Sequence, residues 1–412
     1  MFASSRRLHL ELLCTHGTPV KKNLGYLPAF PIVISFLDYF RGGDVDNLIA
    51  ALEHPDRVRV IDLNVPCSLL EELSTVIQRP FPALRLLQFQ SEQFESTGMP
   101  AIPDTFLSGS APCLQKISIY GIPFPAAPTL LLSAHDLVDV ELCEIPPTGY
   151  IPPEAIVASL AALPSLKHLT FGFESGMSYP DQMHLLPITR TVLPALTRFY
   201  FHGHFGYFED FVAQIDAPRL HCLHIEYLEH QVTDFQIPQL CKFIDRSEKL
   251  KLSRFRRADL FVEPFTAVIE LVHRGRSSFH LSIQEEAIGQ VVNQISAMLS
   301  NVDHLFISSD ALEDDVLGDG IRWLELFHPF TAVKVLSVDD QLSLHIPLAL
   351  KNVTGERAAE VLPALELLCL DNESVTSVKK FVAARQSVGR PVTVLNPGSE
   401  FKESLNTLDI GE

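Results

Sequence analysis

The feature of the sequence that most constrains its fold is a short apolar pattern that recurs along most of the chain. In six segments a proline is followed by apolar residues two, five and seven positions later; these segments begin at Pro82, Pro112, Pro164, Pro194, Pro218 and Pro363. Looser copies begin at Asp56, His135, Glu248, Arg276, Ser300 and Thr331. Of the 36 diagnostic positions 34 are apolar, whereas a composition with 47% hydrophobic residues would fill about half of them. A pattern that recurs about every 28 residues indicates a protein of stacked repeats.

The spacing within each copy predicts a β-strand. Alternate side chains of a strand point to opposite faces, so residues at the fifth and seventh positions, such as Leu169 and Phe171, point together into the protein. The leading proline disfavours helix in the residue before it and marks where the preceding helix ends. This pattern is typical of a leucine-rich repeat. It predicts an α/β fold: a leucine-rich-repeat solenoid, or horseshoe, with a parallel concave sheet and convex helices.

Helical segments are predicted between the strands. In residues 154–163 the apolar residues Ile156, Val157, Leu160 and Leu163 recur at the spacing of one helix face, and Pro153 suits a first helical turn. The other predicted helices span residues 68–78, 181–192, 207–215, 236–245, 264–272, 285–299 and 320–327. One strand and one helix cannot bury their own apolar faces, so neighbouring repeats must stack.

The two ends of the chain depart from the pattern, as capping units of a solenoid do. Residues 1–54 hold no clear repeat and are predicted to be an N-terminal capping segment in which residues 44–54 form a helix. Residues 55–396 are predicted to form a solenoid of about twelve repeats, ending in a helix over 374–387 and a strand over 392–395. The polar residues 397–412 are predicted to be a C-terminal tail.

The concave face of such a solenoid is an extended binding surface. Residues at the fourth, sixth and eighth positions of each repeat should point out from it. In the middle repeats these outward residues include Arg198, Tyr200, His202, His224, Glu226, Arg254 and Arg256. Because tyrosine and arginine are enriched in binding hot spots, these residues are predicted to contact a protein partner, with Tyr200 and Arg198 foremost. The alternative is that they are only solvated strand residues.

The sequence contains no motif that indicates an enzyme. It lacks phosphate-binding glycine loops, the G-x-S-x-G turn and the H-E-x-x-H zinc motif. Five of the sixteen histidines fall between residues 202 and 230, but His202 and His224 suit exposed positions on the binding face better than a metal site. The acidic residues of segment 311–320 do not match the spacing of a calcium loop. No catalytic residue, cofactor or metal is therefore expected.

Composition indicates which classes of partner and which cell compartment to expect. The 412 residues carry 32 basic and 50 acidic side chains, and a net charge of -18 argues against binding to nucleic acid or anionic membranes. The basic residues between Lys249 and Arg257 are either a charged strand edge or a contact for an acidic partner. No signal peptide or membrane span is evident, and seven scattered cysteines suit a reducing compartment. An intracellular protein of the cytoplasm or nucleus, monomeric outside its complex, is expected.

Three features resemble F-box/leucine-rich-repeat proteins, above all those of mushroom-forming fungi. They are the stretch 46–54 leading to a strand at 56–58, the run 69–73 leading to 80–84, and the later Leu-Pro-x-Leu repeat starts. The resemblance covers roughly residues 6–396. It implies a substrate-recognition adaptor of a cullin–RING (SCF) ubiquitin ligase. In that family an N-terminal F-box docks on Skp1, and the repeats bind the protein to be ubiquitinated.

The sequence departs from this family before the first predicted strand. An F-box opens with Leu-Pro followed by amphipathic helices, whereas Leu27-Pro28 continues into Ala-Phe-Pro-Ile-Val. Two alternatives follow. The chain is a shortened form, with Skp1 binding confined to a longer product that carries an F-box, or it is a repeat-only scaffold or degenerate family member without a ligase role.

Overall fold

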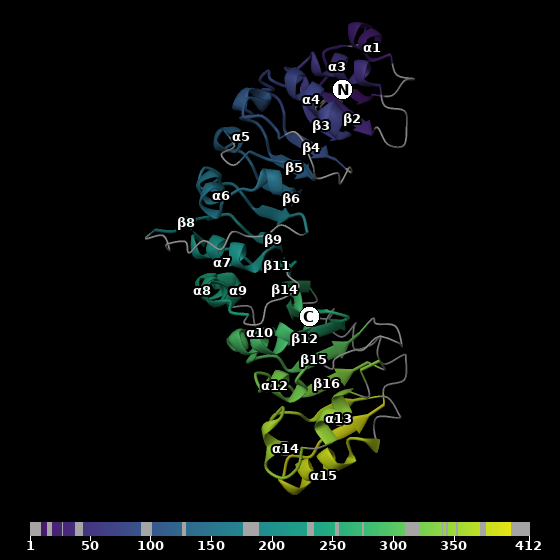
Figure 1. Cartoon of the computed structure of the whole chain (residues 1–412), viewed down its shortest axis with the longest axis vertical. Coiled ribbons are helices and arrows are strands. Elements are labelled where there is room, and N and C mark those ends of the chain that lie inside the picture. The colour runs from purple at the N-terminus through teal and green to yellow at the C-terminus, as the bar shows by residue number, and fades with distance from the viewer. Residues whose placement is uncertain are drawn as a thin grey trace, which may run out of the picture. The chain divides into compact units, whose positions relative to one another are not determined.

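Strands that alternate with helices build both structural units of the chain, Met1–Arg219 and Leu220–Glu412 (Figure 1). The α/β class predicted from the sequence is confirmed. The structure, a computed structural model, describes residues 10–14, 19–26, 28–37, 44–91, 101–125, 129–175, 189–228, 235–251, 255–273, 276–309, 321–339, 341–342, 345–351, 353–370 and 376–396.

The first unit contains a parallel sheet in which strands pair in the order of the chain. Its strands are β1 (Leu10–Leu13), β2 (Ile32–Leu37), β3 (Val58–Asn64), β4 (Leu86–Gln90), β5 (Lys116–Tyr120), β6 (Asp139–Ile145), β7 (His168–Phe173) and β9 (Arg198–Gly203). A separate parallel pair joins β8 (Thr191–Val192) and β10 (Ile215–Asp216). The helices are α1 (Val20–Tyr26), α3 (Val45–Leu52), α4 (Cys67–Val76), α5 (Thr129–Ser133), α6 (Pro153–Leu160) and α7 (Phe205–Ala213), with short 3₁₀ helices at Phe106–Gly109 and Pro147–Gly149.

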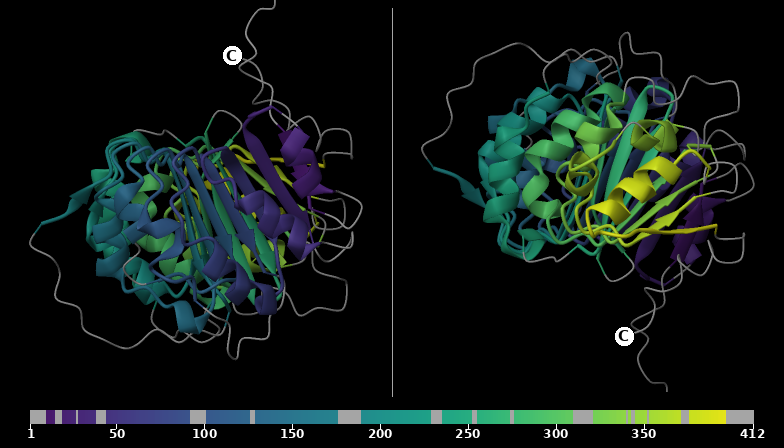
Figure 2. Two further views of the ribbon diagram at one scale, coloured as in Figure 1. Left: turned by 90° about the horizontal axis from the view of Figure 1, so that it is seen from above. Right: turned by 90° about the horizontal axis from the view of Figure 1, so that it is seen from below.

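Equivalent positions of successive repeats lie directly opposite one another in this sheet. The fifth positions pair along the row Ile61, Leu87, Ile117, Val140, Leu169 and Phe199. All six side chains are buried, as the alternation of apolar residues predicts. Helices of the unit lie against one side of the strands, and α6 packs against both α5 and α7 (Figures 1 and 2).

Aromatic side chains fill the core between β7, β9 and α7. Phe171 lies within 5.0–6.5 Å, between ring centroids, of Phe173, Phe201, Tyr207 and Phe211. The Tyr207 hydroxyl donates a hydrogen bond of 2.8 Å to a backbone carbonyl oxygen, so this buried polar atom is satisfied. The inward residues of the repeat are therefore the ones that hold the unit together.

The second unit also combines strands and helices, but its strands do not pair in chain order. They are β11 (Cys222–Tyr227), β12 (Arg257–Glu263), β13 (Thr266–His273), β14 (Arg276–Gln284), β15 (His304–Ser308), β16 (Val335–Val338), β17 (Leu367–Cys369) and β18 (Thr393–Leu395). The helices are α8 (Pro238–Arg246), α9 (Glu248–Lys251), α10 (Ile288–Gln294), α11 (Ser296–Leu299), α12 (Trp323–Phe327), α13 (His345–Lys351), α14 (Arg357–Glu360) and α15 (Lys379–Ser387), with a 3₁₀ turn at Glu285–Ala287.

An inverted meander interrupts the repeat in this unit. β11 pairs in parallel with β14, β14 pairs antiparallel with β13, and β13 pairs antiparallel with β12. β12 then pairs in parallel with β15, and parallel pairing continues in chain order through β16, β17 and β18. The sequence prediction failed here: residues 264–272, expected as a helix, are mostly β13, which makes two antiparallel ladders.

Two repeat starts need correction because of the meander. The repeat begun at Glu248 placed its strand near Phe255, whereas β12 begins only at Arg257. The repeat begun at Arg276 is two residues out of phase, because Leu223 lies opposite Phe279 and not opposite Leu281. The inward side of β14 nevertheless consists of buried apolar residues, Phe279, Leu281 and Ile283.

The remaining helices and terminal segments predicted from the sequence are confirmed only in part. The helices expected near 44–54, 68–78, 154–163, 207–215, 236–245, 285–299, 320–327 and 374–387 are present within a few residues, the one near 285–299 as two short helices, and so is the strand at 392–395. The helix expected at 181–192 is wrong at its end, where residues 191–192 form β8; residues 181–188 lie outside the described residues. Residues 1–54 contain β1 and β2, two strands of the first unit's sheet that the sequence did not predict. The tail over 397–412 also lies outside the described residues.

Candidate functional site

The outward face of β5, β6, β7 and β9 carries polar side chains in rows across the first unit's sheet. One row consists of Lys116, Asp139, His168 and Arg198, which lie opposite one another on successive strands. The next row along the strands consists of Ser118, Glu141, Thr170 and Tyr200. These side chains point away from the buried core because they alternate with inward residues such as Leu169 and Phe199.

Oppositely charged side chains lie next to one another at the β5 and β6 positions of the first row. The ammonium nitrogen of Lys116 lies 2.7 Å from a carboxylate oxygen of Glu141 and 3.4 Å from one of Asp139. Burial acts to lower the pKa of Lys116, but its hydrogen bond to Glu141 and the charges of both acids outweigh burial and raise that pKa. The Asp139 carboxylate also lies 3.8 Å from Nδ1 of His168. The face thus presents fixed charges of both signs.

The predicted contact residues of the first unit share this face. Arg198, Tyr200 and His202 occupy alternate positions of β9; Arg198 is exposed, and the other two are half-buried. Gly172 lies opposite His202, and a Cβ on Gly172 would come within 3.0 Å of the His202 Cβ. Because glycine has no Cβ, the His202 side chain can lie directly beside Gly172.

The second unit brings two histidines and two glutamates together on the outward face of β11, β14 and β13. His224 on β11 lies opposite His280 on β14, and His280 lies opposite Glu270 on β13. The two imidazole rings stack with centroids 3.7 Å apart and an interplanar angle of 9°. Nε2 of His224 is 2.7 Å from Oε1 of Glu226, and Nδ1 of His280 is 2.8 Å from Oε1 of Glu270. We call His224, Glu226, Glu270 and His280 the histidine cluster.

The environment of the Glu270 carboxyl lowers its pKa. The hydrogen bond with His280 lowers the pKa of the Glu270 carboxyl, burial opposes that effect, and the histidine charges add to the lowering. Only 15% of the His280 side chain and 27% of the Glu270 side chain are exposed. This pair is therefore fixed within the sheet surface, whereas the Glu226 side chain is 43% exposed and reaches toward solvent.

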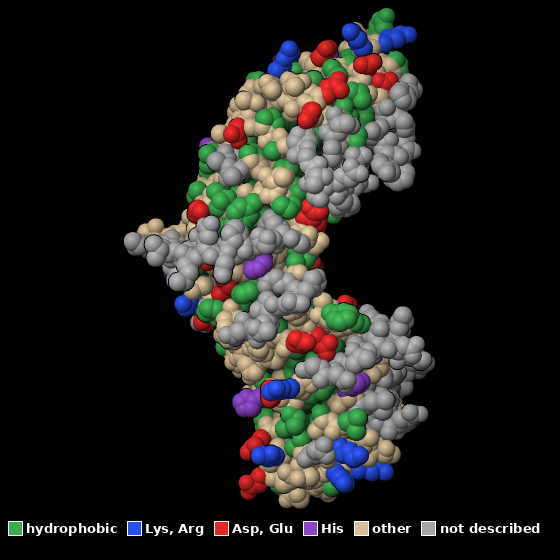
Figure 3. Space-filling model, in the orientation of Figure 1, with side chains coloured by type: hydrophobic (Ala, Val, Ile, Leu, Met, Phe, Trp, Pro, Cys, Tyr) green, Lys and Arg blue, Asp and Glu red, His purple; other side chains and the backbone are tan. Residues whose placement is uncertain are grey.

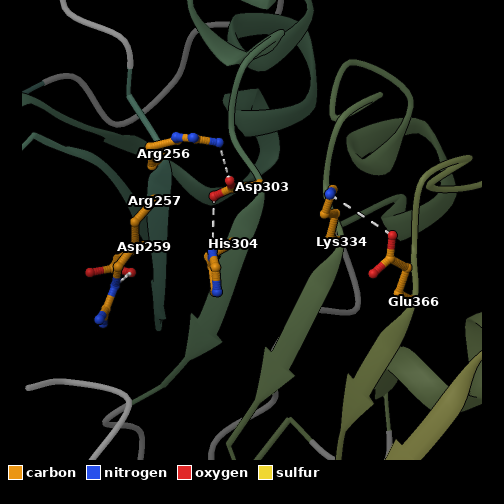
Figure 4. A network of polar contacts seen from close by, with 7 residues as sticks. All are labelled: Arg256, Arg257, Asp259, Asp303, His304, Lys334 and Glu366. Atoms are coloured by element: carbon orange, nitrogen blue, oxygen red, sulfur yellow. Dashed lines mark hydrogen bonds and ion pairs between the residues drawn. The ribbon is translucent and has the colours of Figure 1, made fainter. Parts of the chain in front are cut away.

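The remaining predicted contact residues lie near the start of β12. Arg256 immediately precedes β12 and does not belong to a strand, which corrects its predicted outward strand position; Arg254 lies outside the described residues. The Arg256 guanidinium contacts the carboxylate of Asp303, which also lies 2.9 Å from Nδ1 of His304 (Figure 4). On β12 itself, Arg257 donates a 2.7 Å hydrogen bond to Asp259 (Figure 4).

Sequence reasoning missed Glu270 and His280. His224 and Glu226 were expected at outward positions, but the repeat order predicted a neighbour from residues 252–256, and β14 occupies that place. His280 did stand at an outward position of its repeat, so its face was predictable. Glu270 carried no such signal, because its segment had the apolar spacing of a helix face.

The described surface mixes charges of both signs. On the face shown in Figure 3, acidic and basic side chains are interspersed among hydrophobic and other polar ones. Among the described residues, no helix combines the length and the apolar composition that a bilayer-spanning segment requires. No protein-family model matches the sequence, and no curated protein matches it.

Proposed function

We propose that the chain is a leucine-rich-repeat solenoid that serves as a protein-interaction module. The observation that carries this proposal is the in-register ladder of the first unit, in which the equivalent positions Leu87, Ile117, Val140 and Leu169 lie opposite one another although each belongs to a different repeat. A ladder of this kind leaves one face of every strand available for a partner.

The outward residues of the first unit supply the proposed contacts. Tyr200 offers a large amphipathic ring on β9, and Arg198, Asp139 and Lys116 offer charges of both signs on β9, β6 and β5 of the same face. Tyrosine and arginine anchor many interfaces, and charges of both signs discriminate between partners. The occupant that fits this surface is a protein segment with complementary acidic and basic side chains.

The family resemblance suggests a more specific role. In this proposal the repeats recruit a protein for ubiquitination by a cullin–RING ligase in the cytoplasm or nucleus, and an F-box in a longer product binds Skp1. The second candidate is a repeat-only scaffold that binds a protein partner without any ligase. The departure of segment 27–33 from the F-box pattern favours this second candidate.

A binding assay with purified Skp1 separates the two candidates. Binding to this chain, or to a longer product of the same gene, supports the ligase role. Absence of binding to both contradicts that role and leaves the scaffold.

The binding face is tested with partners captured by the full-length chain. The double variant Arg198→Ala, Tyr200→Ala should weaken capture more than about tenfold, because hot-spot truncations cost 2 kcal/mol or more. The matched control is Gln88→Ala, at the outward position of β4 equivalent to that of Tyr200. Capture that the double variant leaves unchanged would exclude β9 as the contact.

A further inference from the structure

We propose that His224, Glu226 and His280 form a binding site for a zinc ion, and that Glu270 positions His280 for it. This inference is independent of the proposed interaction function. It uses only residues of the second unit, all on the outward face of β11, β14 and β13.

The three ligand side chains already converge. One potential ligand atom from each of His224, Glu226 and His280 lies within 4.8 Å of the other two. A tetrahedral zinc ion with bonds of about 2.0–2.2 Å sets its ligand atoms roughly 3.3–3.6 Å apart. An imidazole nitrogen binds a metal in the plane of its ring, so zinc binding requires the two stacked rings to rotate out of their parallel arrangement until both ligand nitrogens and the Glu226 oxygen face one point. The hydrogen-bonded ladders between β11, β14 and β13 hold the backbones of the three residues in fixed positions.

Glu270 gives His280 the orientation that a metal ligand needs. Nδ1 of His280 lies 2.8 Å from Oε1 of Glu270. When Nδ1 donates its proton in this bond, the lone pair of the neutral ring lies on Nε2. A carboxylate that holds the second nitrogen of a metal-binding histidine fixes its tautomer and raises its basicity. The pair Glu270–His280 has this arrangement.

The hydrogen bond between His224 and Glu226 is the metal-free form of the same site. Nε2 of His224 and Oε1 of Glu226 share a proton across 2.7 Å. For both atoms to bind zinc, this proton must leave for solvent or for Nδ1 of His224. Zinc binding thus replaces a hydrogen bond with two metal bonds and depends on loss of that proton.

The donor set favours zinc over hard cations. Two imidazole nitrogens and one carboxylate oxygen are ligands that zinc accepts, whereas calcium and magnesium take oxygen ligands. Neutral imidazole is the form that binds metal. Three protein ligands leave a fourth position for water.

The simpler alternative is that the cluster consists of two separate histidine–glutamate hydrogen bonds. The two hypotheses predict different effects on metal binding when His280 is replaced. If the pairs are separate, loss of His280 leaves the His224–Glu226 bond intact and has no effect on metal binding. If they form one site, removal of either histidine removes the ion.

Zinc titration of the metal-free full-length chain tests the proposal by isothermal titration calorimetry against a competing chelator. The wild type should bind zinc, and His224→Ala and His280→Ala should each lose one equivalent. Glu270→Gln should weaken that equivalent about 10–100-fold, as loss of a carboxylate behind a ligand does. Circular dichroism verifies that each variant is folded, and Glu270→Gln keeps the test valid should a histidine variant unfold.

Two control variants make the result specific. Cys222→Ser changes a potential ligand on the same strand and face, and His304→Ala changes another histidine paired with an acid. Both should bind zinc like the wild type. Cobalt used in place of zinc should give visible absorption without a thiolate charge-transfer band. Failure of the wild type to bind zinc, or equal binding by the wild type and all His224, His280 and Glu270 variants, would overturn the proposal.

Discussion

The ladder from β4 to β9 and the inverted meander from β11 to β15 solve the same packing problem in different ways. In the ladder, each strand pairs with the next strand of the sheet, and equivalent repeat positions meet. In the meander, two hairpins carry the chain back, so that β14 and not β12 lies beside β11. Both arrangements bury an apolar face. The order of strands across a sheet can therefore change while the rule for its core stays the same.

The outward faces of the two regions differ more than their cores do. In the ladder, the row from Gln88 to Tyr200 contains one ionisable acid, Glu141, among neutral residues. In the meander, the corresponding row is His224, His280, Glu270 and Asp259, all of them titratable. This row is therefore titratable throughout only where the repeat is interrupted, whereas in the ladder the titratable side chains lie in the neighbouring row of Lys116, Asp139, His168 and Arg198.

The largest effect is expected for a cavity in the ladder. Phe171→Ala should lower the free energy of unfolding by about 3–5 kcal/mol, because the Phe171 ring is buried among four other aromatic rings. Denaturant unfolding measures the change. The outward variant Tyr200→Ala is the control and should cost far less. Equal losses for the two variants would contradict the inward and outward assignment of the ladder.

A smaller effect is expected in the histidine cluster. Glu270→Gln should lower the stability of the metal-free protein by about 1 kcal/mol at neutral pH, because a half-buried charged hydrogen bond is weakened. The pKa of Glu270 is lowered in the folded state. Its contribution is therefore complete above the pKa of an unfolded glutamate and is lost as pH falls through the lowered folded value.

Denaturant midpoints measured at neutral and at acidic pH check this dependence. The difference between wild type and Glu270→Gln should shrink as the solution is acidified below the ordinary range of glutamate. A difference that grows on acidification would mean that Glu270 is destabilising as an anion, and the hydrogen bond with His280 could not be its cause.

The turn between β12 and β13 should gain stability from substitution. Phe265 has a φ of 72° and is 83% exposed, and it follows Pro264 in a two-residue loop between the paired residues Glu263 and Thr266. A left-handed φ at the position after proline matches a turn that ordinarily carries glycine. Phe265→Gly should therefore raise the free energy of unfolding by about 0.5–1 kcal/mol, as thermal denaturation can show. Phe265→Ala retains the unfavourable φ and should bring no such gain; an equal gain from alanine would refute the backbone explanation.

The smallest effect is expected for the ion pair at the start of β12. Arg256 is 73% exposed where it contacts Asp303 (Figure 4), so Arg256→Ala should change the free energy of unfolding by less than about 0.5 kcal/mol. Added salt should leave wild type and variant alike in a denaturant titration. A larger loss would show that this contact fixes the meander, which the exposure of Arg256 argues against.

The sequence predicted the ladder well because each of its repeats carries the same local signal. Leu84, Leu87 and Phe89 were assigned inward from their spacing, and all three are buried. The sequence did not predict the meander, because the apolar residues of β13 fit the spacing of a helix and that of a strand. Only the pairing of β13 with β12 and β14 decides between the two. The strands β1 and β2 were not predicted because the segment before residue 54 lacks the repeat pattern.

In the ladder the sequence alone determined which side chains face the core, because the alternation of apolar and polar residues is a local property of each strand. It also placed His224, Glu226 and Tyr200 at outward positions. The tertiary structure alone decided which strands are neighbours, and so it alone put His280 and Glu270 beside His224. The reason is that strand order depends on hydrogen bonding between segments far apart in the chain, and no local pattern records which segment will supply the partner.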